Sequence, residues 1–165
     1  GGLELFHVFR FDTPDGKEYR PLTLTANGDG KMLWQWKGLP APAPLYGLDR
    51  LAAHPGVPIL VTEGEKVADA AEKIFPDFVA VTSPGGSKSP GKAEWSHVQG
   101  RKVVIWGDAD EPGREYADEV ARLCSEAGTA SVSLVDVADG FPRGWDLADA
   151  SADASAQAAA ALASA

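Results

Sequence analysis

Hydrophobic and polar residues alternate along the N-terminal part of the chain, which is typical of β-strands. The alternation runs through residues 3–11, 17–25 and 31–36, and the turn sequences TPDG and NGDG separate these segments. Short turns of this kind join neighbouring antiparallel strands. The pattern therefore predicts an N-terminal antiparallel β-meander, followed by the proline-rich connector GLPAPAP.

Beyond Val57, short hydrophobic runs alternate with segments of helical periodicity. We expect strands and helices at residues 57–62, 66–75, 78–83, 102–107, 112–128 and 130–136. Such an alternation forms βαβ units around a parallel sheet that helices cover on both faces. The predicted organisation is a β subdomain with its connector at 1–56, an α/β domain at 57–150 and an alanine-rich helix at 151–165.

Acidic residues follow two of the predicted strands. Glu63 comes directly after the first, and Asp108 and Asp110 follow the third. Because ligands bind beyond the carboxyl ends of parallel strands, we expect the three carboxylates to converge. Two charges about 4 Å apart repel by about 4 kcal/mol at an effective dielectric constant near 20, so the cluster favours a bound cation. Oxygen ligands at a sheet edge suit Mg²⁺ or Mn²⁺ and phosphoryl-transfer chemistry.

These acidic residues also have a purely structural interpretation. Asp110 or Glu111 would cap the helix that Pro112 begins. Asp146 and Asp149, in the sequence GWDLADA, either add acidic groups to the cluster or include the N-cap of the alanine-rich helix.

Glycine and basic residues supply candidate nucleotide or DNA contacts, namely Lys66, Gly85, Gly86, Lys88, Lys92 and Arg114. The spacing from Gly86 to Lys92 fits a phosphate-binding P-loop, but Ala93 replaces its hydroxyl residue and Pro90 removes a backbone N–H. We therefore reject a P-loop and expect a glycine-rich loop near the acidic residues. A flexible surface loop is the alternative.

Composition limits the function classes. The net charge of −9 argues against a general nucleic-acid coat, because phosphate binding depends mainly on Lys and Arg. Cys124 is the single cysteine, which excludes an internal disulfide and a structural zinc cluster, and its helical spacing places it in the core. With no apolar run of membrane-spanning length and no evident signal peptide, we expect a cytoplasmic protein without a membrane partner. Trp34, Trp36 and Trp95 are interpreted as core or cover, with stacking on single-stranded bases as the alternative.

Three sequence blocks carry a family resemblance. They are LVTEGEKVADAA, VAVTSPGGSKS and VVIWGDADEPGREYADEVARL, each containing a predicted strand followed by an acidic or glycine motif. In this order they resemble a Toprim domain of the primase or primase-helicase type found in phages, plasmids and mobile elements. The resemblance covers about residues 5–150 and implies a Toprim-like Rossmannoid fold.

The resemblance implies that Glu63, Asp108 and Asp110 are catalytic residues that hold divalent metal, and Asp146 stands near the position of a further acidic element of bacterial primases. One departure is Val67, which occupies the position where these enzymes usually carry an aspartate, with Asp69 two residues later. The zinc-binding domain typical of primases is also absent from this sequence.

The expected function is therefore nucleotidyl transfer by a primase that synthesises RNA primers. Its partners would be a single-stranded DNA template and nucleoside triphosphates, with a helicase or zinc-binding domain in the parent protein. Glu63 would hold the metal or act as a general acid or base. Two alternatives stay open, a Toprim nuclease or nickase and a catalytically silent module that binds DNA or a helicase.

Overall fold

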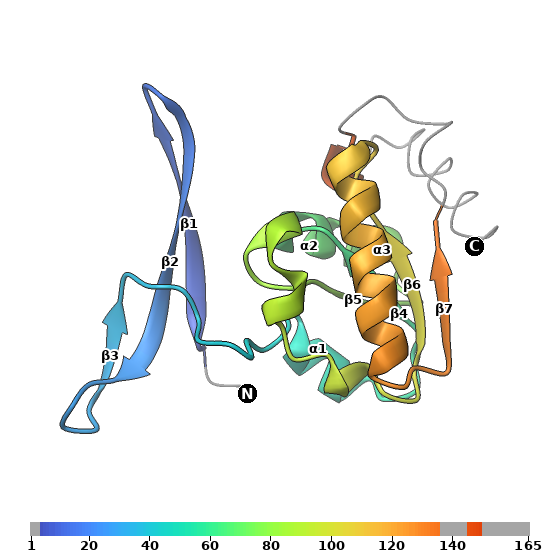
Figure 1. Ribbon diagram of the computed structural model, residues 1–165, viewed down its shortest axis with the longest axis horizontal. Coiled ribbons are helices and arrows are strands. Elements are labelled where there is room, and N and C mark those ends of the chain that lie inside the picture. Colours follow the sequence, from blue (N-terminus) through green and yellow to red (C-terminus); the bar gives the residue numbers. More distant parts are fainter. Residues whose placement is uncertain (1–3, 136–144, 150–165) are drawn as a thin grey trace. The chain divides into compact units, whose positions relative to one another are not determined.

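The computed structural model describes residues 4–135 and 145–149 of the chain (Figure 1). The chain divides into two compact units, Gly1–Ala41 and Pro42–Ala165. The predicted alanine-rich helix at 151–165 lies outside the described residues.

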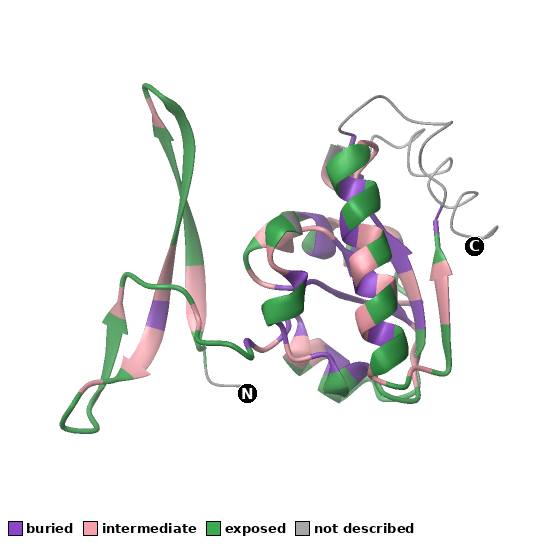
Figure 2. Cartoon of the chain, viewed as in Figure 1, coloured by how far each residue is buried: buried purple, intermediate pink, exposed green. Residues whose placement is uncertain are grey.

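The first unit is a three-stranded antiparallel sheet in the order β1-β2-β3. Its strands are β1 (Phe6–Thr13), β2 (Gly16–Ala26) and β3 (Met32–Gln35). The predicted β-meander is confirmed. Thr23 is the buried residue of this sheet, and its hydroxyl donates to the backbone carbonyl of Lys37 at 2.6 Å. Most other side chains of the strands are partly or fully exposed (Figure 2).

The second unit is built on a four-stranded parallel sheet in the order β5-β4-β6-β7. The strands are β4 (Ile59–Thr62), β5 (Val79–Val81), β6 (Lys102–Trp106) and β7 (Ser131–Leu134). The α-helices are α1 (Leu48–Ala53), α2 (Glu65–Ile74) and α3 (Glu111–Glu126), and short 3-10 turns lie at Gly86–Lys88, Pro90–Lys92, Ser96–Val98 and Leu147–Asp149. The expected α/β fold with a parallel sheet flanked by helices is confirmed.

Alternate residues of the central strand β4 pack into two separate cores. Ile59 and Val61 join the cluster that contains α3, whereas Leu60 joins the cluster that contains α2. Cys124 lies fully buried in the α3 cluster, and burial raises the pKa of its thiol to about 12, so the core interpretation of this residue is confirmed. The sheet is thus covered on both faces, as continuous apolar strands require.

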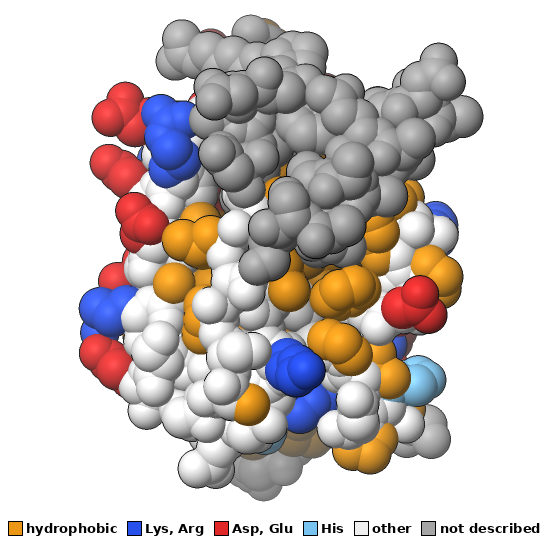
Figure 3. Space-filling view, turned by 90° about the vertical axis from the view of Figure 1, so that its right-hand side faces the viewer, with side chains coloured by type: hydrophobic (Ala, Val, Ile, Leu, Met, Phe, Trp, Pro, Cys, Tyr) orange, Lys and Arg blue, Asp and Glu red, His pale blue; other side chains and the backbone are white. Residues whose placement is uncertain are grey.

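The edge strand β7 carries hydrophobic side chains on the face shown in Figure 3, where charged residues of α3 follow one margin. Leu134 on this strand is 45% exposed.

Among the described residues, no helix has both the length and the apolar character needed to cross a bilayer.

From the two central strands, β4 and β6, the chain continues toward opposite edges of the sheet. The connection from β4 through α2 leads to β5 on one side, and the connection from β6 through α3 leads to β7 on the other. The switch point therefore lies between β4 and β6. In open α/β sheets, ligands bind at this point, beyond the carboxyl ends of the strands.

Candidate active site

Glu63 and Asp108 leave neighbouring strands at the switch point. Thr62 at the end of β4 lies opposite Trp106 at the end of β6. Glu63 comes one residue after Thr62, and Asp108 comes two residues after Trp106. Neighbouring strands lie about 4.8 Å apart. The structure therefore places the Glu63 and Asp108 blocks beside each other at the carboxyl ends of β4 and β6.

Two glycines hold the Asp108 loop against the start of α3. A Cβ atom added at Gly107 would lie 2.3 Å from the carbonyl oxygen of Gly113, and a Cβ atom at Gly113 would lie 2.3 Å from the carbonyl oxygen of Asp108. Neither distance is compatible with a side chain. The loop and the helix therefore approach each other as closely as their backbones permit.

Asp110 is the N-cap of α3. It has extended backbone geometry, and its carboxylate accepts a hydrogen bond from the backbone N–H of Gly113 at 2.9 Å. The interpretation of Asp110 as a helix cap is therefore confirmed. The cap uses one of its two carboxylate oxygens. Glu111 is the first residue of the helix and is exposed.

The segment that contains Asp146 lies beside the Asp108 loop. The backbone N–H of Ala109 donates to the carbonyl oxygen of Trp145 at 3.2 Å. Asp146 accepts from the backbone N–H of Ala148 at 2.7 Å and lies 4.0 Å from the amino group of Lys66. Asp146 thus caps a 3-10 turn and links this turn to the start of α2.

The glycine turn follows β5, the strand on the other side of β4. Gly85 and Gly86 have φ angles of 93° and 70°, a backbone conformation that favours glycine. Burial raises the pKa of Glu65, at the first position of α2, and the backbone N–H of Gly85 is among the groups that lower it. The turn therefore lies against the residue that follows Glu63-Gly64.

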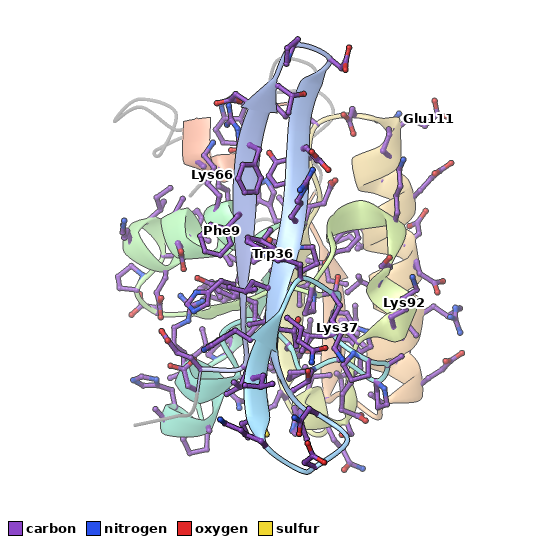
Figure 4. The ribbon with its side chains drawn as sticks, turned by 90° about the vertical axis from the view of Figure 1, so that its left-hand side faces the viewer. Phe9, Trp36, Lys37, Lys66, Lys92 and Glu111 are labelled. Atoms are coloured by element: carbon purple, nitrogen blue, oxygen red, sulfur yellow. The ribbon has the colours of Figure 1, made fainter. Side chains whose placement is uncertain are left out.

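The predicted basic residues do not form one group. Lys66, Lys88, Lys92 and Arg114 are all exposed. Lys66 is the second residue of α2 and lies beside Asp146. A Cβ atom at Gly91 would lie 3.8 Å from the Glu119 carboxylate, so the neighbouring Lys92 lies beside the middle of α3. Glu119 lies eight residues beyond Glu111, or about 12 Å along the helix. Figure 4 accordingly shows Lys66 and Glu111 toward one end of the unit and Lys92 farther down.

Asp69 does not replace the aspartate missing at Val67. Its carboxylate accepts hydrogen bonds from the Tyr46 hydroxyl at 2.9 Å and from Arg50 at 3.2 Å. Arg50 also pairs with Glu72. This network fastens α1 and the preceding connector to α2, so Asp69 is a structural residue here.

Tyr116 is a site residue that the sequence analysis missed. It lies on α3, is 1% exposed, and its hydroxyl contacts residues at the ends of both β4 and β5. Burial raises the pKa of this phenol, and the negative charge of Glu63 raises it further. Its helical spacing indicates only a core residue, because no local pattern reports contacts with two distant strands.

The first unit carries an open row of aromatic rings. On one face of its sheet, ring centroids are 5.0 Å apart for His7 and Trp34 and 5.4 Å apart for Phe9 and Trp36 (Figure 4). Trp34 is 42% exposed and Trp36 is 59% exposed, so the expectation that they are core or cover is wrong. The described part of this unit, residues 4–41, contains strands but no helix that could cover this face. The same expectation is confirmed for Trp95, which is 5% exposed.

The acidic side chains at the strand ends offer few protein ligands to a magnesium ion. Among residues 4–135 and 145–149, no group of three or more His, Cys, Asp or Glu side chains is arranged to hold a metal ion. The expected metal-binding group of three carboxylates is therefore not found in the described part of the chain. Mg²⁺, however, is commonly held by one or two carboxylates and completed by waters and substrate phosphates. Glu63 and Asp108, at adjacent strand ends, fit a two-carboxylate arrangement.

Comparisons with known proteins identify the fold. No protein-family model and no curated protein sequence matches the chain. The Aquifex aeolicus primase structure with zinc-binding and RNA polymerase domains matches 95% of this chain at a TM-score of 0.55 and 16% identity. A DnaG primase catalytic domain bound to single-stranded DNA matches 95% of this chain, with a TM-score of 0.51 and 17% sequence identity. The RNA polymerase domain of Mycobacterium tuberculosis primase DnaG matches 93% of this chain, with a TM-score of 0.50 and 16% sequence identity.

These likenesses show that the chain has the fold found in primase catalytic domains. The chain spans only 39%, 50% and 59% of those three structures. It therefore corresponds to part of each of them.

Proposed function

We propose that this chain is part of the catalytic core of a DNA primase, which adds ribonucleotides along a single-stranded DNA template. One observation carries the proposal. Glu63 and Asp108 leave adjacent strands at the switch point of a sheet that has the primase fold. This is the position where an α/β sheet binds its ligand, and carboxylates are the side chains that magnesium requires there.

In this proposal, Glu63 and Asp108 would hold Mg²⁺ or Mn²⁺, and the negative charge of Asp110, two residues from Asp108, would add to the attraction for the cation. The bound ion would neutralise the charge that develops on the triphosphate during nucleotidyl transfer. Asp146 orients Lys66 beside the site, since the two side chains lie 4.0 Å apart. Lys66 and Arg114 then offer positive charge to phosphate from the first turns of α2 and α3.

The aromatic row supports contact with the template. Single-stranded bases stack on exposed rings without a requirement for sequence. The row ends at Arg20, whose guanidinium lies 5.5 Å from the centre of the Phe11 ring. Lys88 and Lys92 supply further positive charge in the second unit. The parent protein would add a helicase or a zinc-binding domain.

Primer synthesis tests the proposal. The chain is incubated with single-stranded template, ribonucleotides and Mg²⁺, and RNA products are resolved by length. We expect products from the wild type and a loss of at least about 100-fold in Asp108→Ala and Glu63→Ala. Asp118→Ala is the control, because Asp118 is an exposed residue of α3 beyond its first turn.

Two results would contradict the proposal. Cleavage of the DNA without ribonucleotide addition would indicate a nuclease that uses the same site. Equal primer synthesis in the wild type and both site variants would show that these carboxylates take no part in the reaction.

A further inference from the structure

The hydroxyl of Tyr116 contacts two strand ends at once. It donates to the carbonyl oxygen of Thr62 at 2.9 Å and lies 3.2 Å from the Ser83 hydroxyl and 3.4 Å from the Thr82 hydroxyl. A phenol has a single proton to donate. Because the Thr62 carbonyl oxygen accepts the hydrogen bond from this proton, the hydroxyls of Ser83 and Thr82 must be the donors in the other two contacts.

These contacts are made where water cannot replace them. Thr62, Thr82 and Ser83 are each 0% exposed, and Tyr116 is 1% exposed. A buried polar group that loses its partner carries the full cost of its lost hydration. The hydrogen bonds of the Tyr116 hydroxyl therefore hold the ends of β4 and β5 in place.

The positions that it fixes are those next to the site motifs. Thr62 directly precedes Glu63, and Ser83 is followed by Pro84 and the glycine turn. Tyr116 itself lies six residues beyond Asp110 on the helix that Asp110 caps. One side chain thus connects the glutamate block, the glycine turn and the aspartate block.

We propose that Tyr116 is a positioning residue of the site, whose hydroxyl sets the orientation of the peptide between Thr62 and Glu63 and thereby directs the Glu63 carboxylate toward Asp108. It also seats the glycine turn through Ser83. The part of this inference that concerns metal rests on the proposed function. The part that concerns the two strand ends does not.

Tyr116→Phe is the decisive variant, because it removes the hydroxyl and keeps the ring in the core. Val120→Ala is its matched control. Val120 lies one turn farther along α3, is 0% exposed and packs in the same core cluster, but its side chain has no polar atom. We expect both variants to lower the stability of the fold and only Tyr116→Phe to alter the strand ends directly.

Amide hydrogen exchange of the metal-free chain gives the first measurement. In Tyr116→Phe we expect exchange in segments 62–64 and 83–86 to be faster by about tenfold than in Val120→Ala, after both are corrected for global unfolding. Ser83→Ala is the second variant if Tyr116→Phe fails to fold, and it should accelerate exchange in segment 83–86 alone. Equal exchange in the hydroxyl and control variants would overturn the inference.

Manganese affinity gives the second measurement. We expect Tyr116→Phe to bind Mn²⁺ about tenfold more weakly than the wild type, the effect typical of residues that orient metal ligands, and Val120→Ala to bind as the wild type does. Unchanged affinity in Tyr116→Phe would overturn the metal part of the inference while the proposed function stands. A wild type that binds no Mn²⁺ would overturn the proposed metal site, and the exchange measurement would still decide whether Tyr116 positions the strand ends.

Discussion

Asp110 is a helix cap in the structure, and its proposed second function is to bind a cation. Its carboxylate caps α3 through the backbone N–H of Gly113, and the same residue stands two positions from Asp108 at the edge of the sheet. A cap requires an oxygen acceptor, whereas a cation site also requires negative charge. Substitutions can therefore separate the two functions.

Asp110→Asn and Asp110→Ala make this separation. Asparagine caps a helix about as well as aspartate, so Asp110→Asn should unfold in urea near the wild-type midpoint while it loses Mn²⁺ affinity. Asp110→Ala should lose the affinity and also about 1 kcal/mol of stability. Full Mn²⁺ affinity in Asp110→Asn would show that the residue is a helix cap alone.

Glu65 gives a prediction about pH. Burial raises the pKa of its carboxyl above the ordinary 4.5, and one carboxylate oxygen is buried without a hydrogen-bond partner among the described residues. A raised pKa means that the ionised form is less stable in the folded chain than in the unfolded chain. This penalty is absent below pH 4.5 and is complete once the pH exceeds the folded pKa.

Glu65→Gln should therefore raise the free energy of unfolding at pH 7. The gain should shrink as the pH falls toward 4, where both states of the wild type are protonated. Denaturant unfolding at several pH values measures the difference, with Glu115→Gln, an exposed substitution on α3, as the control. A gain that is independent of pH would contradict the charge explanation.

At the scale of elements, the contact between the Asp108 loop and α3 depends on glycine. Gly113→Ala places a methyl group against the backbone of Asp108, at a position where the added Cβ would lie 2.3 Å from its carbonyl oxygen. We expect a loss of about 1–3 kcal/mol in urea unfolding, as overpacking typically costs. Gly56→Ala is the control, since a Cβ atom there meets nothing within 4 Å. Equal stability of the two variants would contradict the close contact.

The aromatic face of the first sheet gives a prediction about the template. Trp36→Ala removes a ring that is 59% exposed, and we expect affinity for oligodeoxythymidylate to fall about tenfold. Tyr19→Ala is the matched control, because Tyr19 is similarly exposed, at 61%. Tyr19 lies opposite Arg10 in the strand register, and Arg10 follows Phe9, so Tyr19 is on the other face of the sheet from Phe9. Fluorescence anisotropy of a labelled oligonucleotide measures both. Equal losses in the two variants would remove this face from the template site.

The regular elements were predictable because each has a local pattern. The helix expected at 112–128 is observed at Glu111–Glu126, and the expected β-meander is present. The segment after Ser83 was expected as a loop and contains three 3-10 turns, which depend on hydrogen bonds between near neighbours rather than on periodicity. The role of Asp69 and the contacts of Tyr116 were not predictable, because their partners lie on distant segments.

At the scale of the whole molecule, charge and fold must be reconciled. The net charge of −9 opposes binding to DNA, and salt weakens the remaining contacts of lysine and arginine with phosphate. In the proposed site, Glu63 and Asp108 at adjacent strand ends would use part of this negative charge to bind a cation. The chain covers only part of the primase structures that share its fold, and under the proposed function further template contacts would come from the rest of a parent protein.

A double-mutant cycle on Mn²⁺ affinity tests most directly whether carboxylates from β4 and β6 share one cation. Glu63→Gln, Asp108→Asn and the double variant are titrated with Mn²⁺ by electron paramagnetic resonance, with Asp118→Asn as the control. We expect each single substitution to weaken binding by about tenfold or more and the double variant to show a coupling of about 1 kcal/mol or more between the two sites. Wild-type affinity in either single variant, or strictly additive losses in the double variant, would contradict a shared ion.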